Sequence, residues 1–328
     1  MRIPPGLKRS LRPLVFHTRQ WRRRLRDRLL PPRAWNGEHD PALLRFEPWS
    51  GTADGTHAYD FLGVRTDPAY RRQFSADPPG PLRTRYPHPS YTYLELIFVL
   101  QSVLDARERF CMIEIGASYG PWLVVADRAT RISTGLPTRL VGVEMVPQYH
   151  RWMEQHFRDN GIDPAQHLLM HSAVSDFEGA AGFDQALPCD LDYGQNVARR
   201  RSEAESATGA EGSAVACTTL PRILERVETV DLLHADAQGE EERILSLGRP
   251  QLERQVRRLF VATHSRRLHR ALRRSFPATH WEPIHDFPPR SRARTRYGDI
   301  ELLDGVLAWV NRRRLTDGAP AAGGRGPT

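Results

Sequence analysis

The sequence predicts an α/β fold with a mostly parallel central sheet flanked by helices, preceded by a loop-rich N-terminal extension. From residue 91 onward, short apolar runs alternate with segments of helical periodicity. The runs are continuous rather than alternating, which is typical of strands buried on both faces of a parallel sheet. No run approaches the roughly 18 apolar residues that a membrane span requires. The predicted strands are residues 111–115, 139–143, 167–174, 230–235, 258–263 and 305–310.

The N-terminal segment holds most of the positive charge. The chain of 328 residues has 47 Lys+Arg against 39 Asp+Glu, a formal charge of +8. Residues 1–33 contain eleven basic residues and one acid, so the rest of the chain carries −2. The high pI therefore comes from a tail and does not predict a nucleic-acid partner. Residues 7–30 fit either a solvated helical tail or a basic amphipathic helix in weak contact with an anionic membrane surface.

Composition divides the remaining chain into three parts. Residues 34–90 are rich in proline and glycine, yet they contain eight aromatic residues, which argue against a disordered linker. We expect this extension to pack on the main domain, and its aromatic faces could also form part of a substrate site. Residues 91–313 form the predicted main domain, with a polar loop at 198–214. Residues 314–328 form a predicted disordered tail.

Capping and stop signals predict the helix boundaries. Thr92 and Glu95 form a capping-box pattern in front of an apolar helical face. Pro121 and Pro147 stand where the first residue of a helix is expected, and Gly161 stands where a helix should end.

The strongest local signal is the segment 114–120, which reads Glu-Ile-Gly-Ala-Ser-Tyr-Gly. It follows a predicted strand and precedes Pro121, so a ligand can approach the backbone closely at a helix N-terminus. A dinucleotide loop requires Gly-x-Gly-x-x-Gly, whereas Ser118 occupies the second glycine position here. The pattern therefore favours a cofactor without a pyrophosphate, S-adenosyl-L-methionine, over a nicotinamide dinucleotide.

Glu144 closes the next predicted strand, 28 residues after Gly116. A carboxylate at that point can accept charge-assisted hydrogen bonds from both hydroxyls of a ribose. The alternative is an ordinary turn with an exposed acid. Together with the glycine loop, Glu144 indicates a cofactor that contains adenosine.

In order along the chain, these features resemble the FkbM-type S-adenosylmethionine-dependent methyltransferases over about residues 90–312. The characteristic family stretch normally reads Lys-x-Asp-x-x-Gly-x-Glu. Asp236, Gly239 and Glu241 match it, while His234 replaces the lysine. A later strand end is usually Glu-x-His, of which His264 matches and Ala262 replaces the glutamate. Further segments that carry the resemblance are 113–120, 172–176 and 304–311.

The resemblance implies a class I (Rossmann-like) methyltransferase fold for residues 91–313, with S-adenosyl-L-methionine as the cofactor. The residues that it implies for the cofactor site are Glu114, Gly116, Ala117, Ser118, Tyr119, Gly120, Glu144, Met145, Ala173, Val174 and Asp236.

Two side chains are candidates for a general base, His264 and Asp236, because both follow predicted strands at their carboxyl ends. Histidine has the better intrinsic pKa for a base near neutrality. The alternatives are a structural role for His264 and a helix-capping role for Asp236. Asp236, Glu240 and Glu241 could supply oxygen ligands to Mg²⁺. However, the two glutamates point to different helix faces, so the sequence predicts no metal.

The sequence therefore predicts an O-methyltransferase that acts on a hydroxyl of a saccharide or secondary metabolite, with a small-molecule or glycan substrate. A cytoplasmic location fits the absence of a signal peptide and three widely spaced cysteines without a CxxC pair. The eight arginines in 254–274 fit a solvated helix face better than a site for an anionic substrate. The alternative hypothesis is a catalytically decayed cofactor-fold scaffold that docks on a membrane or a glycan-assembly partner through helix 7–30.

Overall fold

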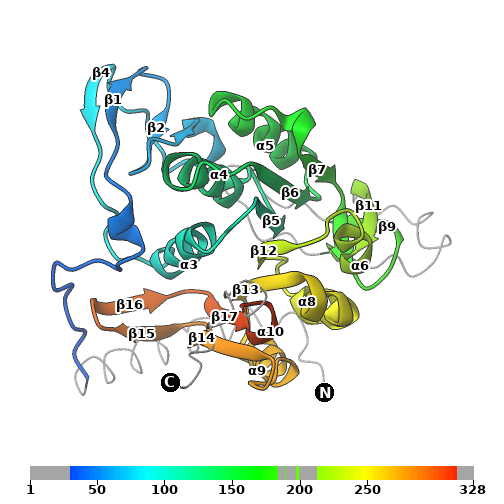
Figure 1. The fold of residues 1–328 in the computed structure, drawn as a ribbon. Coiled ribbons are helices and arrows are strands. Elements are labelled where there is room, and N and C mark those ends of the chain that lie inside the picture. Colours follow the sequence, from blue (N-terminus) through cyan, green and yellow to red (C-terminus); the bar gives the residue numbers. More distant parts are fainter. Residues whose placement is uncertain (1–29, 184–188, 190–196, 199–212, 316–328) are drawn as a thin grey trace, which may run out of the picture.

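The computed structural model describes residues 30–183, 189, 197–198 and 213–315 (Figure 1). Except for Leu30, the predicted basic helix lies outside the described residues. Most of the predicted loop 198–214 and of the predicted tail 314–328 also lies outside them.

A seven-stranded sheet forms the centre of the main domain, in the order β14-β17-β13-β12-β5-β6-β7 (Figure 1). The pairs from β13 to β7 are parallel, and β17 is antiparallel to both of its neighbours. The predicted mostly parallel sheet is therefore confirmed. Its strands are β5 (Phe110–Ile115), β6 (Thr138–Glu144), β7 (Leu168–His171), β12 (Val230–Ala235), β13 (Val256–Thr263), β14 (Trp281–Phe287) and β17 (Gly305–Asn311).

Helices cover both faces of this sheet. The strands supply alternating side chains to two cores. Met112 and Leu232 belong to the core under α3 and α4, and Ile113 and Leu233 to the core under α6 to α9. The central strands are buried on both faces, which explains their continuous apolar runs. The helices are α3 (Tyr93–Leu104), α4 (Pro121–Ser133), α5 (Pro147–Asp159), α6 (Leu220–Leu224), α7 (Glu241–Leu247), α8 (Arg249–Gln255), α9 (Arg266–Ser275) and α10 (Arg312–Leu315).

Most of the predicted helix boundaries are confirmed. Pro121 and Pro147 are the first residues of α4 and α5, and Gly161, two residues after α5, has a φ of +68°. The predicted capping box is wrong, because the Thr92 side chain makes no cap hydrogen bond. The side chain of Glu95 points instead to His234 on the sheet.

The predicted strand 167–174 is also wrong as a single strand. It is divided into β7 and β8 (Ala173–Ser175), which belong to different sheets. Ser172 lies at the division: its N–H donates to the Glu144 carbonyl at 3.0 Å, and its hydroxyl donates to the Ala216 carbonyl at 2.9 Å. The second sheet has the order β10-β9-β11-β8, with β9 (Gly179–Phe183), β10 (Val197–Ala198) and β11 (Ser213–Thr219).

Strand β14 and a hairpin of β15 (Ser291–Thr295) and β16 (Gly298–Leu302) were not predicted. Their charged side chains hide the strand pattern, and cross-strand pairs such as Arg292 with Glu301, 2.6 Å apart, stabilise the hairpin. The N-terminal segment joins this hairpin, where Arg33 N donates to the Asp299 carboxylate at 3.2 Å.

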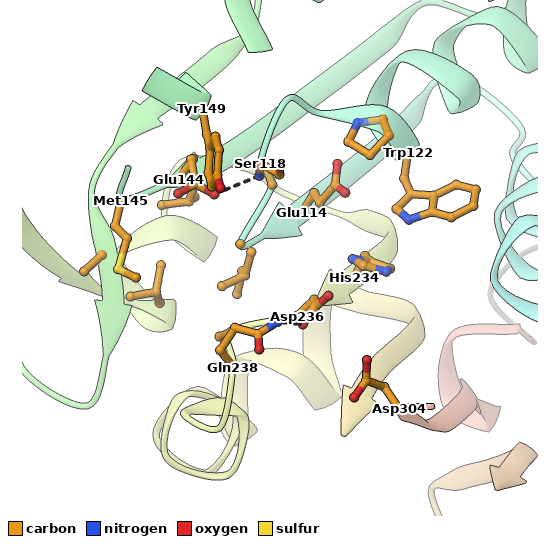
Figure 2. Close-up of a pocket in the computed structure, with 18 of the residues that line it drawn as sticks. Glu114, Ser118, Trp122, Glu144, Met145, Tyr149, His234, Asp236, Gln238 and Asp304 are labelled. Atoms are coloured by element: carbon orange, nitrogen blue, oxygen red, sulfur yellow. Dashed lines mark hydrogen bonds between the residues drawn. The ribbon is translucent and has the colours of Figure 1, made fainter. Parts of the chain in front are cut away.

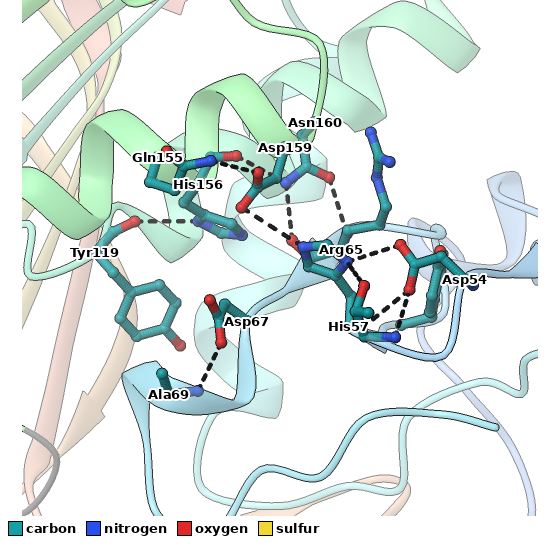
Figure 3. Close-up of polar contacts among 12 residues, drawn as sticks. Asp54, His57, Arg65, Asp67, Ala69, Tyr119, Gln155, His156, Asp159 and Asn160 are labelled. Atoms are coloured by element: carbon teal, nitrogen blue, oxygen red, sulfur yellow. Dashed lines mark hydrogen bonds and ion pairs between the residues drawn. The ribbon is translucent and has the colours of Figure 1, made fainter. Parts of the chain in front are cut away.

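The extension packs on the main domain through α5 (Figure 3). The Asn160 side chain holds the backbone of Arg65 at both its N–H and its carbonyl, at 2.8 Å each. His57 lies 3.6 Å from Asp159.

Within the described ranges, no helix has the length and apolar character needed to span a bilayer. The small elements are η1 (Leu43–Arg45), β1 (Ser50–Ala53), β2 (Ala58–Tyr59), β3 (Arg65–Thr66), η2 (Pro68–Tyr70), β4 (Gly80–Arg83) and η3 (Pro164–Gln166).

Candidate active site

A cavity of about 410 Å³ opens at the carboxyl ends of β5, β6 and β12 (Figure 2). Ligands bind at this edge in open α/β sheets. Of the predicted residues, Tyr119, Gly120 and His264 lie outside its lining. Those that line it are Glu114, Gly116, Ala117, Ser118, Glu144, Met145, Ala173, Val174 and Asp236.

The glycine loop is tight because two neighbouring strands hold it. The N–H groups of Gly116 and Ala117 both donate to the Val143 carbonyl, at 3.0 and 3.1 Å. Gly116 has a φ of +74°, and a Cβ added there would lie 2.0 Å from the Asp236 carbonyl oxygen. Only glycine permits this approach, which brings the ends of β5 and β12 together around the cavity.

Glu144 links the glycine loop to the end of β6. One carboxylate oxygen accepts from Ser118 N at 2.8 Å (Figure 2). The other accepts from Val146 N at 2.7 Å. Burial raises the pKa of Glu144 to about 7, although these backbone donors oppose the increase. A carboxylate has about four acceptor positions. Glu144 can therefore accept further hydrogen bonds from a ligand that enters the cavity.

The wall beyond Glu144 is largely apolar. Met145 follows it directly, and Ala173 and Val174 on β8 are buried. Tyr149 on α5 lies beside Glu144 (Figure 2). This wall suits the flat face of a heterocycle.

His264 lies behind Asp236, among three carboxylates. Its Nε2 atom is 2.9 Å from Asp236 and 3.3 Å from Glu241, and its Nδ1 atom is 3.3 Å from Asp304. Burial lowers the pKa of His264, but the contacts with these acids outweigh burial and raise the pKa to about 12. The imidazole is therefore a cation at neutral pH.

Three of these residues, Asp236, Glu241 and His264, lie close enough together to hold a metal ion. Within the described ranges, ligand atoms of Asp236, Glu241 and His264 lie within 4.8 Å of one another. Glu240, the other acid that could supply a metal ligand from the sequence, instead accepts from the Ser175 hydroxyl at 2.7 Å and pairs with Arg243. In the structure the ring of His264 forms an ion cluster with Asp236 and Glu241.

Replacing Glu241 by alanine is expected to destabilise the protein by about 3 kcal/mol, because it leaves two backbone donors without their acceptor and removes one of the three acids around the His264 imidazolium. Glu241 is fully buried and accepts from Ala237 N at 2.9 Å and Gly239 N at 3.0 Å. Equilibrium urea unfolding measures the loss. The control is Glu242→Gln on the same helix, for which we expect a change within about 0.5 kcal/mol. Equal stability of Glu241→Ala and wild type would contradict the structural role of the cluster.

Glu114 belongs to a group of three polar residues at the cavity whose other two members, Glu95 and His234, were not predicted as site residues; Glu114 and His234 are buried and Glu95 is partly exposed. Glu95 from α3 contacts the Nε2 atom of His234 on β12, and Glu114 lies beside His234 on β5. The interruption of the apolar run 94–104 by Glu95 is the one signal that could have indicated this group. Trp122 on α4 also lines the cavity.

The extension supplies a further part of the wall. Tyr70 is buried and its ring lies 5.1 Å from that of Tyr119 in the glycine loop. The next residue, Arg71, lines the cavity, and so does Tyr91 at the start of the main domain. His156 Nδ1 donates to the Tyr119 carbonyl at 3.0 Å (Figure 3). Although Tyr119 does not line the cavity, it joins the glycine loop to the extension and to α5.

The strand order and the cavity define a Rossmann-like fold of the class I methyltransferase type. No family model matches the chain. The chain is similar to a "Putative methyltransferase" of Jannaschia sp. (strain CCS1), with 27% identity over 236 residues, which cover 69% of this chain and 82% of that protein.

Solved structures show only remote similarity. An rRNA methylase from Streptococcus thermophilus aligns with a TM-score of 0.39 and 9% identity over 68% of this chain and 97% of its own. An O-methyltransferase from Bacillus cereus in complex with SAH aligns with a TM-score of 0.36 and 11% identity, over 69% and 84%. A SAM-dependent methyltransferase from Agrobacterium tumefaciens gives 0.39 and 13%, over 80% and 70%. Since these scores are low, the assignment of the fold depends on the strand order.

Proposed function

We propose that this protein is an S-adenosylmethionine-dependent methyltransferase. The observation that carries the proposal is Glu144, which closes β6 opposite the glycine loop and points into the cavity (Figure 2). A carboxylate in that position suits the two ribose hydroxyls of an adenosine. The 27% identical relative, named a putative methyltransferase, supports the same class.

The residues present fit this cofactor. Buried in the cavity wall, the Ser118 hydroxyl and the Oε2 atom of Glu114 have no hydrogen-bond partner within the described part of the chain. We assign the ribose to Glu144, the adenine to the wall of Met145 and β8, and the amino-acid end to the region of Glu114. Ser118 has a φ of +50°, so the loop turns there without the second glycine of a pyrophosphate site.

When bound, the cofactor supplies an electrophilic methyl group on a sulfonium. The chain must hold an acceptor atom in line with it, and such positioning can contribute on the order of 7–11 kcal/mol to the lowering of the barrier. We propose that the acceptor is a hydroxyl of a saccharide or secondary metabolite. Asp236 lines the cavity and would receive the acceptor proton, and the His264 cation would hold the Asp236 carboxylate in place. His264 therefore acts as a positioning residue for Asp236 and not as the general base, because a protonated ring cannot accept a proton.

Calorimetric titration of S-adenosylhomocysteine into the purified protein tests the proposal, with NAD as the control ligand. We expect micromolar binding of S-adenosylhomocysteine, about −8 kcal/mol, and none of NAD. Asp236→Asn should retain this binding and lose methyl transfer to acceptors found by screening. A folded protein that binds NAD instead, or neither ligand, would overturn the proposal.

A further inference from the structure

A second cavity, of about 390 Å³, lies at the edge of the central sheet opposite the proposed cofactor site. It opens where β12 and β13 begin and where α3 ends, beside α10. Asp231 lines this cavity and Asp236 lines the first one, and five residues of strand span about 17 Å. The two cavities are therefore separate. The charged residues that line the second one, here called the basic cavity, are Asp105, Arg107, Asp231, Arg257, Arg258 and Arg314.

The basic cavity and the cofactor cavity differ in the sign of their charge. Four arginines and two aspartates give the lining of the basic cavity a formal charge of +2. The lining of the cofactor cavity has four carboxyl side chains and one arginine. Residues 34–328 as a whole carry a formal charge of −2, so the arginines of the basic cavity are a local concentration of positive charge. Such a cavity attracts anions.

Each aspartate holds one arginine in place. The side chain of Asp231 is 7% exposed, and its carboxylate accepts from Cys111 N at 2.8 Å and pairs with Arg257 at 3.2 Å. Asp105, which follows α3 directly, pairs with Arg258, whose side chain is 12% exposed. The guanidinium of Arg258 also lies 5.3 Å from the centre of the Phe98 ring. Since a guanidinium has five N–H donors, each of these arginines keeps donors for a further partner.

Two observations show that these pairs leave the basic cavity incompletely satisfied. Arg107 is exposed and makes no ion pair with any described residue. The Nε atom of Arg257 is buried and has no hydrogen-bond partner within the described part of the chain. A buried donor without an acceptor is costly. An anion in the cavity would supply acceptor oxygens and balance the excess charge.

We propose that the basic cavity binds the phosphate group of a small, polar phosphate monoester. Such a group carries a charge of about −1.5 to −2 at pH 7, which matches the charge of the lining. The planar fork of a guanidinium also fits two phosphate oxygens at once. The cavity volume lies within the range of small-molecule sites, about 300–1,000 Å³, so it has room for the rest of a small ester. No aromatic ring is among the described residues that line it, so a nucleobase would find no ring to stack on.

Calorimetric titration of glycerol 3-phosphate into the purified protein, at about 0.15 M salt, tests the proposal. We expect a Kd below about 1 mM, and we expect inorganic phosphate to compete for the same site. Acetate at the same ionic strength is the control. It has a single charge and two oxygens, so it should bind at least about tenfold more weakly. Wild-type protein that does not bind glycerol 3-phosphate, or that binds acetate equally well, would overturn the proposal.

Two variants of Arg107 locate the binding in this cavity. Arg107→Gln should weaken the binding of glycerol 3-phosphate about tenfold, because a charged hydrogen bond is lost. Arg107→Glu should weaken it further, since it removes the net positive charge of the lining. Arg107 is exposed, so both variants should fold as wild type does. The matched control is Arg270→Glu, an exposed arginine on α9 that does not line the cavity, which should bind as wild type does. Equal affinity of Arg107→Glu and wild type would place the anion elsewhere and overturn the assignment.

Vesicles of phosphatidylcholine with phosphatidic acid distinguish a free ester from a lipid headgroup. We expect wild type and Arg107→Glu to co-sediment with them equally, because the cavity is proposed to hold a free small molecule. Co-sedimentation that is lost in Arg107→Glu but not in Arg270→Glu would assign the cavity to a lipid phosphate instead. This site is independent of the proposed function: S-adenosylhomocysteine should bind Arg107→Glu as it binds wild type.

Discussion

Replacing Glu144 by alanine is expected to weaken binding of S-adenosylhomocysteine by roughly 100- to 1000-fold, which corresponds to about 3–4 kcal/mol. Two hydrogen bonds from ribose hydroxyls to a carboxylate are each worth about 1.5–3 kcal/mol. The same carboxylate accepts from Ser118 N and Val146 N, so alanine also leaves two backbone donors without their partner. The loss should therefore combine missing ligand contacts with a loosened glycine loop.

Glu144→Gln separates these two contributions. Its amide keeps one acceptor oxygen, so it should lose less affinity than alanine does. Calorimetric titration measures both variants, with circular dichroism as the test of folding. The matched control is Glu154→Ala on α5, an acid that pairs with Arg158 at 3.5 Å and does not line the cavity. If Glu144→Ala bound S-adenosylhomocysteine within about threefold of wild type, Glu144 would not be the ribose anchor.

The sequence predicts the centre of the fold well because burial on both faces leaves a clear pattern. Strands β5 and β12 lie almost where the apolar runs 111–115 and 230–235 place them. The prolines at the starts of α4 and α5 are local signals, since each fixes a backbone angle at a position that lacks a hydrogen-bond partner in any case.

The errors arise where long-range partners decide the structure. The run 167–174 is mostly apolar and was therefore predicted as one strand. Its division at Ser172 comes from the hydrogen bonds of that residue to Glu144 and Ala216, which no local pattern indicates. The hairpin β15–β16 is held by pairs such as Arg292 with Glu301 and by the distant Arg33. Its alternation of charged residues looks like a loop until the partner strand is known.

In the site, too, local features could be predicted from the sequence, whereas features that depend on distant residues could not. Gly116 and Glu144 could be chosen from the sequence because a strand end, a glycine turn and an acid follow one another at fixed spacing. The charge state of His264 could not, because it depends on Asp236, Glu241 and Asp304, which only the folded chain brings to one ring. Glu95 was misread for a similar reason: its sequence neighbours fit a helix cap, whereas its partner is His234, 139 residues away.

Replacing Gly116 by alanine is expected to destabilise the protein by about 3–4 kcal/mol and to abolish cofactor binding. A left-handed backbone conformation costs an alanine about 1–2 kcal/mol. The added Cβ would also lie 2.0 Å from the Asp236 carbonyl oxygen, which is backbone and cannot rotate away. Forcing an atom into packed surroundings costs about 1–3 kcal/mol more. The clash can be relieved only if β5 and β12 separate at the edge where the cavity opens.

Gly135→Ala is the matched control, because it isolates backbone strain from the clash. Gly135 has a φ of +66°, close to the +74° of Gly116, but a Cβ there would meet no atom within 4 Å. It should therefore lose only about 1–2 kcal/mol in urea unfolding and bind S-adenosylhomocysteine as wild type does. The difference between the two variants, about 2 kcal/mol, measures the close approach of Gly116 to Asp236. Equal losses of stability in the two variants would mean that the ends of β5 and β12 are not held at this distance in solution. In that case the glycine loop would not be the rigid wall that the proposed cofactor site requires.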